Sequence, residues 1–163
     1  MNINFLALLL AATSTLAVGF IWYHPKVFGT IWMKESGVTE ETMKGSNMIV
    51  IFTMSILYAF LISFTLNFLV IHQTGAISAT LDIKNVDPSV LKNYLDAYGD
   101  TYRTYKHGAL HGFMTGLFFA LPVIGVNALY ERKSWKYVLI AGGYWVVTCT
   151  VMGAIICGFK YSL

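Results

Sequence analysis

Charged residues and cysteines are scarce in this sequence. Charged side chains account for 12% of the 163 residues, against roughly 25% in a typical soluble domain, and a soluble protein of this length could not bury so much apolar surface. The two cysteines, Cys149 and Cys157, form no CxxC motif, so we interpret them as buried free thiols. The net charge of +3 comes without a basic cluster on a long polar element, and nucleic acid is therefore not an expected partner.

Long apolar runs are what the sequence has instead. Four runs of about 20 residues contain no Asp, Glu, Lys or Arg, and about 20 residues is the length that a helix needs to span a bilayer. The predicted fold class is therefore all-α: a polytopic membrane protein with four transmembrane helices and short interfacial or extramembrane helices in loops 1 and 2, forming a single membrane domain over residues 1–163. The expected spans are about 5–23, 48–71, 109–130 and 137–157.

The residues that flank the runs predict the orientation of the chain. The first run lacks the positively charged start of a signal peptide and is too long for one, so we interpret it as a retained membrane helix. Loops 1 and 3, about residues 24–47 and 131–136, carry six Lys and Arg residues against five on the other side, and three of the six lie in "ERKSWK". The positive-inside rule then favours loops 1 and 3 in the cytoplasm and both termini outside it.

Loop 2, about residues 72–106, contains a helix signal of its own. The stretch "VDPSVLKNYLDAYGD" predicts a short helix near 88–98, with Asp87 as its N-cap and a proline at the first helical position. We expect the next helix to run without a break from Thr101 through the third span. Within that span Pro122 predicts a kink, because proline cannot donate a backbone hydrogen bond.

The stretch "HGALHGFMTG", at the start of the third span, places two kinds of residue at a spacing of four. Residues four apart lie on one face of a helix, so a column of glycines runs beside a column of histidines. Small residues at this spacing let two membrane helices approach closely. We therefore predict a helix-packing seam formed by Gly108, Gly112 and Gly116.

Three histidines are expected at one end of the spans. His107 and His111 lie in the same stretch, and His72 ends the second run on the same side of the membrane. Three imidazoles suit zinc or copper with water as a fourth ligand, but no HExxH or acid–His spacing supports a metal site. The alternative is a pair of interfacial histidines that bond to Asp96, Asp100, backbone or headgroups. We favour this alternative and expect no cofactor and no stoichiometric metal.

A second polar group is expected where the first and third spans meet loops 1 and 3. One hypothesis is an enzyme or headgroup site with Glu131 as a base. The alternative is a loop anchor, in which Glu131 pairs with a neighbouring Lys or Arg and the aromatic residues mark the membrane interface. One carboxylate without a paired acid, nucleophile or metal does not make a catalytic site, so we favour the anchor. This interfacial cluster consists of Trp22, Tyr23, Trp32, Asn127, Glu131 and Arg132.

Two long segments have a familiar pattern. "GFIWYHPKVFGTIWMKESGVTEE" and "HGFMTGLFFALPVIGVNALYERKSWKYVLIAGGYW" resemble the start and the second half of the domain of unknown function 1761 family of small bacterial membrane proteins. The resemblance implies an integral protein of four helices in a bacterial inner membrane, and it implies no reaction and no substrate. The matched residues are Gly19, Trp22, Tyr23, Phe28, Gly29, Trp32, His111, Gly112, Asn127, Glu131, Arg132, Gly143, Tyr144 and Trp145.

Three classes of function remain open from the sequence. The first, which we favour, is a structural or accessory membrane component that packs through its glycine-rich seams, without enzymatic activity, and with the bilayer and a second copy or another membrane protein as partners. The second is an oligomeric channel or transporter for a small solute, although no span carries the ionisable residue that such proteins usually have. The third is a membrane metal-binding protein or enzyme that uses His72, His107 and His111.

Overall fold

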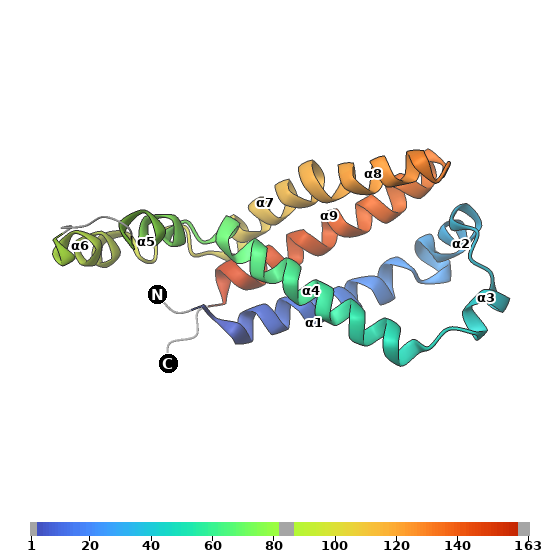
Figure 1. The fold of residues 1–163 in the computed structure, drawn as a ribbon, viewed down its shortest axis with the longest axis horizontal. Coiled ribbons are helices and arrows are strands. Elements are labelled where there is room, and N and C mark those ends of the chain that lie inside the picture. The colour runs from blue at the N-terminus through green and yellow to red at the C-terminus, as the bar shows by residue number, and fades with distance from the viewer. Residues whose placement is uncertain (1–2, 82–86, 160–163) are drawn as a thin grey trace.

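The protein is built from helices, as predicted. The computed structural model describes residues 3–81 and 87–159, and every regular element in these residues is a helix (Figure 1). Four helical segments are long and apolar enough to cross a membrane. They are α1 (Phe5–Trp22), α4 (Met48–Val70), the continuous segment Tyr105–Tyr130, and α9 (Trp135–Gly158).

The burial pattern of these helices is that of a protein surrounded by lipid. Small side chains lie inside, since Ala7, Ala11 and Ala12 are fully buried. Many large apolar side chains lie outside, and Phe20 and Ile49 are each 79% exposed. In water such a surface would be strongly unfavourable, whereas lipid tails are as apolar as the side chains that meet them. The four apolar helices therefore fit a membrane protein.

The third apolar segment is not one uniform helix. It comprises α7 (Tyr105–Thr115), the π-helical turn η2 (Gly116–Ala120) and α8 (Leu121–Tyr130). Pro122, at the start of α8, has no N–H for an α-helical hydrogen bond. The turn directly before α8 is π-helical, and such a turn contains one residue more per hydrogen-bonded ring than an α-helix does. The expectation that this helix runs from Thr101 is wrong: Tyr102 has a positive φ of 63°, and the helix begins only at Tyr105.

The helices pack most closely at one end of the bundle. The segment α7–η2–α8 lies alongside α9 over its whole length, while α4 crosses them obliquely and diverges toward its own N-terminus (Figure 1). The Asn4 amide donates to the carbonyl of Phe159, so the start of α1 and the end of α9 are adjacent. The core lies at this end and consists of Leu8, Ala11, Leu66, Val70, Ile71, Met152, Ile156 and Cys157.

Loop 1 holds three short helices and rests against loop 3. The helices are η1 (Pro25–Gly29), α2 (Thr30–Ser36) and α3 (Glu40–Lys44). Lys133 donates to the carbonyl of Ser36, and the Ser134 hydroxyl donates to the Glu35 carboxylate. These two hydrogen bonds connect the loops at the end of the bundle opposite the core.

Loop 2 forms a helical pair beyond the core end of the bundle. The predicted helix is present as α6 (Pro88–Tyr98), and Asp87 caps it by accepting from the Ser89 amide at 2.9 Å, which lowers the pKa of the Asp87 carboxyl. A second helix, α5 (Gln73–Leu81), lies beside α6 and was not predicted (Figure 1). Residues 82–86 of loop 2 lie outside the described part of the chain.

Candidate functional site

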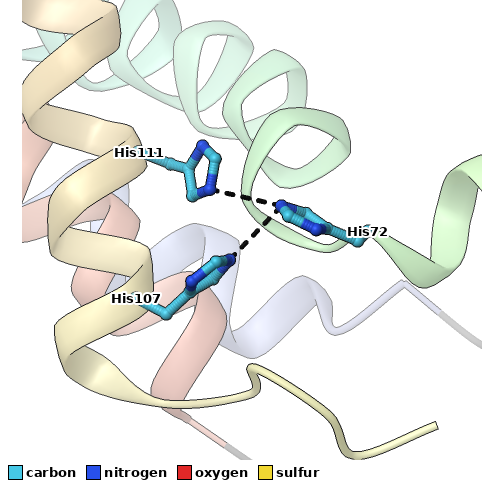
Figure 2. Close-up of side chains that lie close together, drawn as sticks. All are labelled: His72, His107 and His111. Carbon is cyan, nitrogen blue, oxygen red and sulfur yellow. Dashed lines mark hydrogen bonds between the residues drawn. The ribbon is translucent and has the colours of Figure 1, made fainter. Parts of the chain in front are cut away.

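Three histidine side chains converge where α4 ends and α7 begins. The Nε2 atom of His72 lies 3.2 Å from Nε2 of His111 and 3.3 Å from Nε2 of His107. Figure 2 shows the His72 ring pointing from the end of α4 toward both rings on α7. One ligand atom from each of the three side chains lies within 4.8 Å of the other two. His72 is exposed and the other two are half-buried, so water reaches the cluster.

Two buried neighbours hold His72 in place. Helix α4 ends at Val70, and Ile71 is extended and only 4% exposed, within the core. On the other side Gln73 is 3% exposed and donates through Nε2 to the carbonyls of Tyr98 and Thr101, both at 2.9 Å. The backbone around His72 is therefore fixed by the core on one side and by loop 2 on the other.

The other two histidines are one turn apart on α7. The helix starts where the Thr104 hydroxyl accepts from the amide of His107, as an N-cap does. A spacing of four puts His107 and His111 on one face, with ring centroids 4.5 Å apart. The Thr115 hydroxyl donates to the His111 carbonyl, one further turn along.

Tyr102 covers the open side of the cluster. Its ring stacks on that of His107, with centroids 5.0 Å apart and planes 23° apart, and lies 6.1 Å from the ring of His72. A φ of 63° is unfavourable for an aromatic residue, at about 1 kcal/mol or more. The turn is held by α9, because Cys157 Sγ donates to the Tyr102 carbonyl and Arg103 Nε donates to the Cys157 carbonyl.

The distances from Nε2 of His72 to the other two Nε2 atoms are those expected for ligands of one metal ion. Zinc–imidazole bonds are about 2.0–2.1 Å long, so two histidine nitrogens on one tetrahedral zinc ion lie about 3.3 Å apart. The two distances of 3.2 and 3.3 Å from His72 match this value. The donor set is all imidazole, which suits zinc, copper or nickel.

Asp96, one of the acidic residues expected beside the histidines, has a charged partner on its own helix. Asp96 forms an ion pair with Lys92, one turn away on α6. Among the described residues, the group of side chains that could hold a metal ion consists of the three histidines and contains no carboxylate. Two contacts of hydrogen-bond length, both made by Nε2 of His72, join the three imidazoles.

The glycine column of α7 lies against α9. A Cβ atom on Gly108 would overlap the carbonyl oxygen of Gly153, and one on Gly112 would overlap the carbonyl oxygen of Cys149. A Cβ atom on Gly116 would lie 2.5 Å from the Cα atom of Val146. Two turns of α7 and the first residue of η2 thus have room for hydrogen only at these positions, and the backbones of the two segments touch.

The interfacial cluster divides into two parts. The Trp22 indole donates to the carbonyl of Ile140 at 3.0 Å, and the Tyr23 ring lies 5.1 Å from Trp32 and 5.2 Å from Tyr144. Asn127, Glu131 and Arg132 occupy the end of α8 and the turn after it, where Arg132 has a φ of 55°.

An ion pair of Glu131 with a neighbouring cation is not formed among residues 3–81 and 87–159. The contacts between loops 1 and 3 are instead made by Glu35, Ser36, Lys133 and Ser134. The contact that anchors loop 1 to loop 3 is therefore made by other residues than Glu131 and its expected cationic partner.

Two residues at the histidine cluster escaped the sequence analysis. Gln73 follows directly after His72, and an amide side chain next to a candidate ligand was a signal that could have been used. Tyr102 carries no local signal, because its position depends on a left-handed turn that α9 holds in place. Both residues belong to loop 2 or its borders, which the family resemblance did not cover.

The comparisons with known proteins identify a family and no more. No curated protein matched the chain significantly. No solved structure matched it significantly either. One family model, described as "Protein of unknown function (DUF1761)", matches residues 6–157 and so includes all four apolar segments and the three histidines. The match confirms the resemblance seen in the sequence, and the chain belongs to the DUF1761 family.

Proposed function

We propose that this chain is an integral membrane protein that binds one transition-metal ion of the zinc class through His72, His107 and His111. The observation that carries the proposal is that Nε2 of His72 lies at the spacing of tetrahedral metal ligands from Nε2 of both His107 and His111, with one ligand atom of each side chain within 4.8 Å of the other two. Three protein ligands leave a fourth position for water or for a substrate atom, which is the pattern of catalytic rather than structural zinc sites.

Hydrogen bonding alone accounts less well for this arrangement. A neutral imidazole has one N–H donor and one acceptor nitrogen with a single lone pair. Nε2 of His72 faces two Nε2 atoms at 3.2 and 3.3 Å, so as donor or as acceptor it can satisfy only one of them well. A cation between the rings would accept a lone pair from all three nitrogens at once.

This proposal differs from the expectation of a metal-free histidine edge. The sequence places only His107 and His111 at a ligand spacing, and two nitrogens are too few for a closed site. The third nitrogen comes from a residue 35 positions earlier, at a helix end that the core and loop 2 hold in place.

Zinc titration of purified protein tests the proposal. Protein in detergent would be stripped with a chelator, dialysed into metal-free buffer and titrated with zinc by calorimetry. We expect about one zinc per chain, with an affinity that falls by about 100-fold or more in the His72→Ala variant, because a site with two protein ligands loses much of its binding free energy.

His24→Ala is the matched control, because His24 is the remaining histidine and lies in loop 1 at the other end of the bundle. It should bind zinc as the unchanged protein does. Absence of stoichiometric zinc, or equal affinities for the two variants, would overturn the proposal.

The structural or accessory role favoured from the sequence remains a second candidate. The sequence favoured it because no span carries a strong charge, and left open whether the glycine seam packs within one chain or between chains. Gly108, Gly112 and Gly116 already face α9 of the same chain, so the seam supports folding of one chain rather than assembly. The channel alternative has no observation of its own in its favour, and we rank it third.

The location we propose is the inner membrane of a bacterium, with both termini and the histidine cluster on the non-cytoplasmic side. Support comes from the basic residues of "ERKSWK" in loop 3 and from the uncharged first residues. A topology reporter fused after Leu163 should read as non-cytoplasmic, and one inserted in loop 3 as cytoplasmic. The reverse pattern would place the cluster on the cytoplasmic side.

A further inference from the structure

An apolar cavity begins at the histidine cluster and runs into the membrane-spanning region. It has a volume of about 800 Å³ and lies between α4 and the segment α7–η2–α8. On the latter segment its lining extends from His111 to Ile124, a length of about 20 Å at 1.5 Å per residue. One leaflet of the bilayer has a hydrocarbon depth of about 15 Å. The cavity is therefore long enough for one acyl chain.

The lining of this cavity has one polar end. Leu61, Leu69 and Phe118 are among its apolar walls. Its two threonines, Thr65 and Thr115, donate their hydroxyls to carbonyls of their own helices. Apart from Trp145 and Cys149 of α9, the imidazole of His111 is the remaining polar side chain of the lining, and it lies toward the end of the spans, where a lipid headgroup would lie.

A second cavity lies on the other side of the cluster. It has a volume of about 230 Å³ and is lined by His72, Gln73, Thr101 and three tyrosines of loop 2, Tyr94, Tyr98 and Tyr102. Gln73 is 3% exposed, and its Oε1 atom has no hydrogen-bond donor among the described residues, although its Nε2 atom donates twice. A buried acceptor of this kind is destabilising unless a ligand or water satisfies it.

The histidine cluster lies between the two cavities. His111 lines the apolar cavity, His72 lines the tyrosine-lined cavity, and their Nε2 atoms are 3.2 Å apart. A molecule that occupied both cavities would need an apolar tail, an anionic or metal-binding centre and a hydrogen-bond-donating head. A divalent cation on three neutral imidazoles retains its charge of +2, which complements an anionic phosphate.

We propose that the two cavities form one binding site for a glycerophospholipid whose headgroup donates hydrogen bonds. An acyl chain occupies the apolar cavity, a phosphate oxygen takes the fourth position on the metal, and an ammonium or hydroxyl headgroup donates to Gln73 Oε1. The phosphate contact rests on the proposed metal site. The acyl-chain and headgroup contacts do not, since they use residues outside the three ligands.

The test compares two lipids that differ only in the headgroup. Dioleoyl phosphatidylethanolamine has an ammonium group that donates hydrogen bonds, and dioleoyl phosphatidylcholine has none. Both would be offered together to the delipidated protein in detergent, and bound lipid would be measured by native mass spectrometry. We expect one lipid per chain and a preference of about tenfold or more for the ethanolamine lipid, from loss of one buried hydrogen bond to a charged group.

Two threonine variants separate the cavity from the general lipid surface. Thr65→Phe places a ring in the apolar cavity, and it should lower lipid retention about tenfold. Thr13→Phe is its control, because Thr13 is also exposed on a spanning helix and also donates its hydroxyl to the carbonyl four residues earlier, but does not line the cavity. It should retain lipid as the unchanged protein does.

The same measurement with and without zinc distinguishes this proposal from the metal site. If zinc does not bind but the ethanolamine preference and the Thr65→Phe loss remain, the lipid site stands without the metal. Equal retention of both lipids by the unchanged protein overturns the headgroup contact, whatever the variants do. Equal retention by the Thr65→Phe and Thr13→Phe proteins overturns the acyl-chain cavity and leaves only a surface layer of lipid.

Discussion

The two faces of α7 use the same four-residue spacing for different purposes. On one face Gly108, Gly112 and Gly116 bring the backbone into contact with α9. On the other face, about 100° around the helix, His107 and His111 meet His72, and His111 lines the apolar cavity. The first face has room only for hydrogen atoms, and the second has room for a ligand.

This difference shows how one helix can be held firmly while its other side stays open. A membrane protein gains little from burying apolar side chains, since lipid is as apolar as its interior, and close backbone packing provides the stability instead. Once α7 is fixed on α9, α4 can cross it at an angle and leave the apolar cavity between them (Figure 1). We therefore expect substitutions on the glycine face to affect folding and those on the histidine face to affect binding.

The largest effect is expected for Gly112→Leu. A side chain at this position meets the Cys149 carbonyl, so α7 and α9 must separate, and we expect a loss of about 3 kcal/mol in the free energy of unfolding. Unfolding in detergent by heat or denaturant measures it. Gly75→Leu is the control, because Gly75 is also helical and a Cβ atom there meets nothing within 4 Å. Similar losses for the two variants would show that the seam is not a special contact.

A smaller loss of stability is expected for Thr104→Ala, which removes the N-cap of α7. The Thr104 hydroxyl caps the helix by accepting from the His107 amide, and loss of an N-cap costs about 1 kcal/mol. Thr104→Ser keeps the cap and should restore stability. Zinc affinity should fall in the alanine variant and recover in the serine variant, since the first turn of α7 orients His107. An alanine variant as stable as the serine variant would contradict the role of the cap.

The smallest effect on folding is expected when His107→Ala and His111→Ala are combined. Polar contacts between membrane helices contribute about 0.6 kcal/mol each, and these side chains are half-buried rather than part of the core. Without metal the double variant should thus unfold within about 1 kcal/mol of the unchanged protein. Zinc at 100 times its dissociation constant should stabilise the unchanged protein by about 2.7 kcal/mol and the double variant not at all. A double variant that fails to fold would place the histidines in the folding core.

Much of the fold could be predicted because it depends on local signals. Apolar runs of bilayer length indicate the four long helices, and Asp87 followed by a proline indicates the start of α6. The start of the third helix could not be predicted in the same way. Its position depends on the strained turn at Tyr102, which is held by hydrogen bonds to Cys157, more than 50 residues later.

The candidate site was only partly predictable for a related reason. The spacing of His107 and His111 already indicates a shared helical face, and His72 is expected on the same side of the membrane. The role of Gln73 and of the two cavities depends on how α4 and loop 2 lie against α7. This arrangement cannot be predicted from the spacing of residues along the chain. The loop 1 to loop 3 contact shows the same limit, since Lys133 and Ser134 make it rather than Glu131 and Arg132.

The sequence by itself determined that this chain forms four apolar helices, because helix length and hydropathy are properties of contiguous residues. It also determined that Gly108, Gly112 and Gly116 share one face of α7, because helical periodicity follows from spacing. Only the tertiary structure decided which helix that face meets and that one ligand atom from each of the three histidines lies within 4.8 Å of the other two. The reason is geometric: a metal-binding spacing depends on the crossing of α4 over α7, which core packing sets and no local pattern encodes.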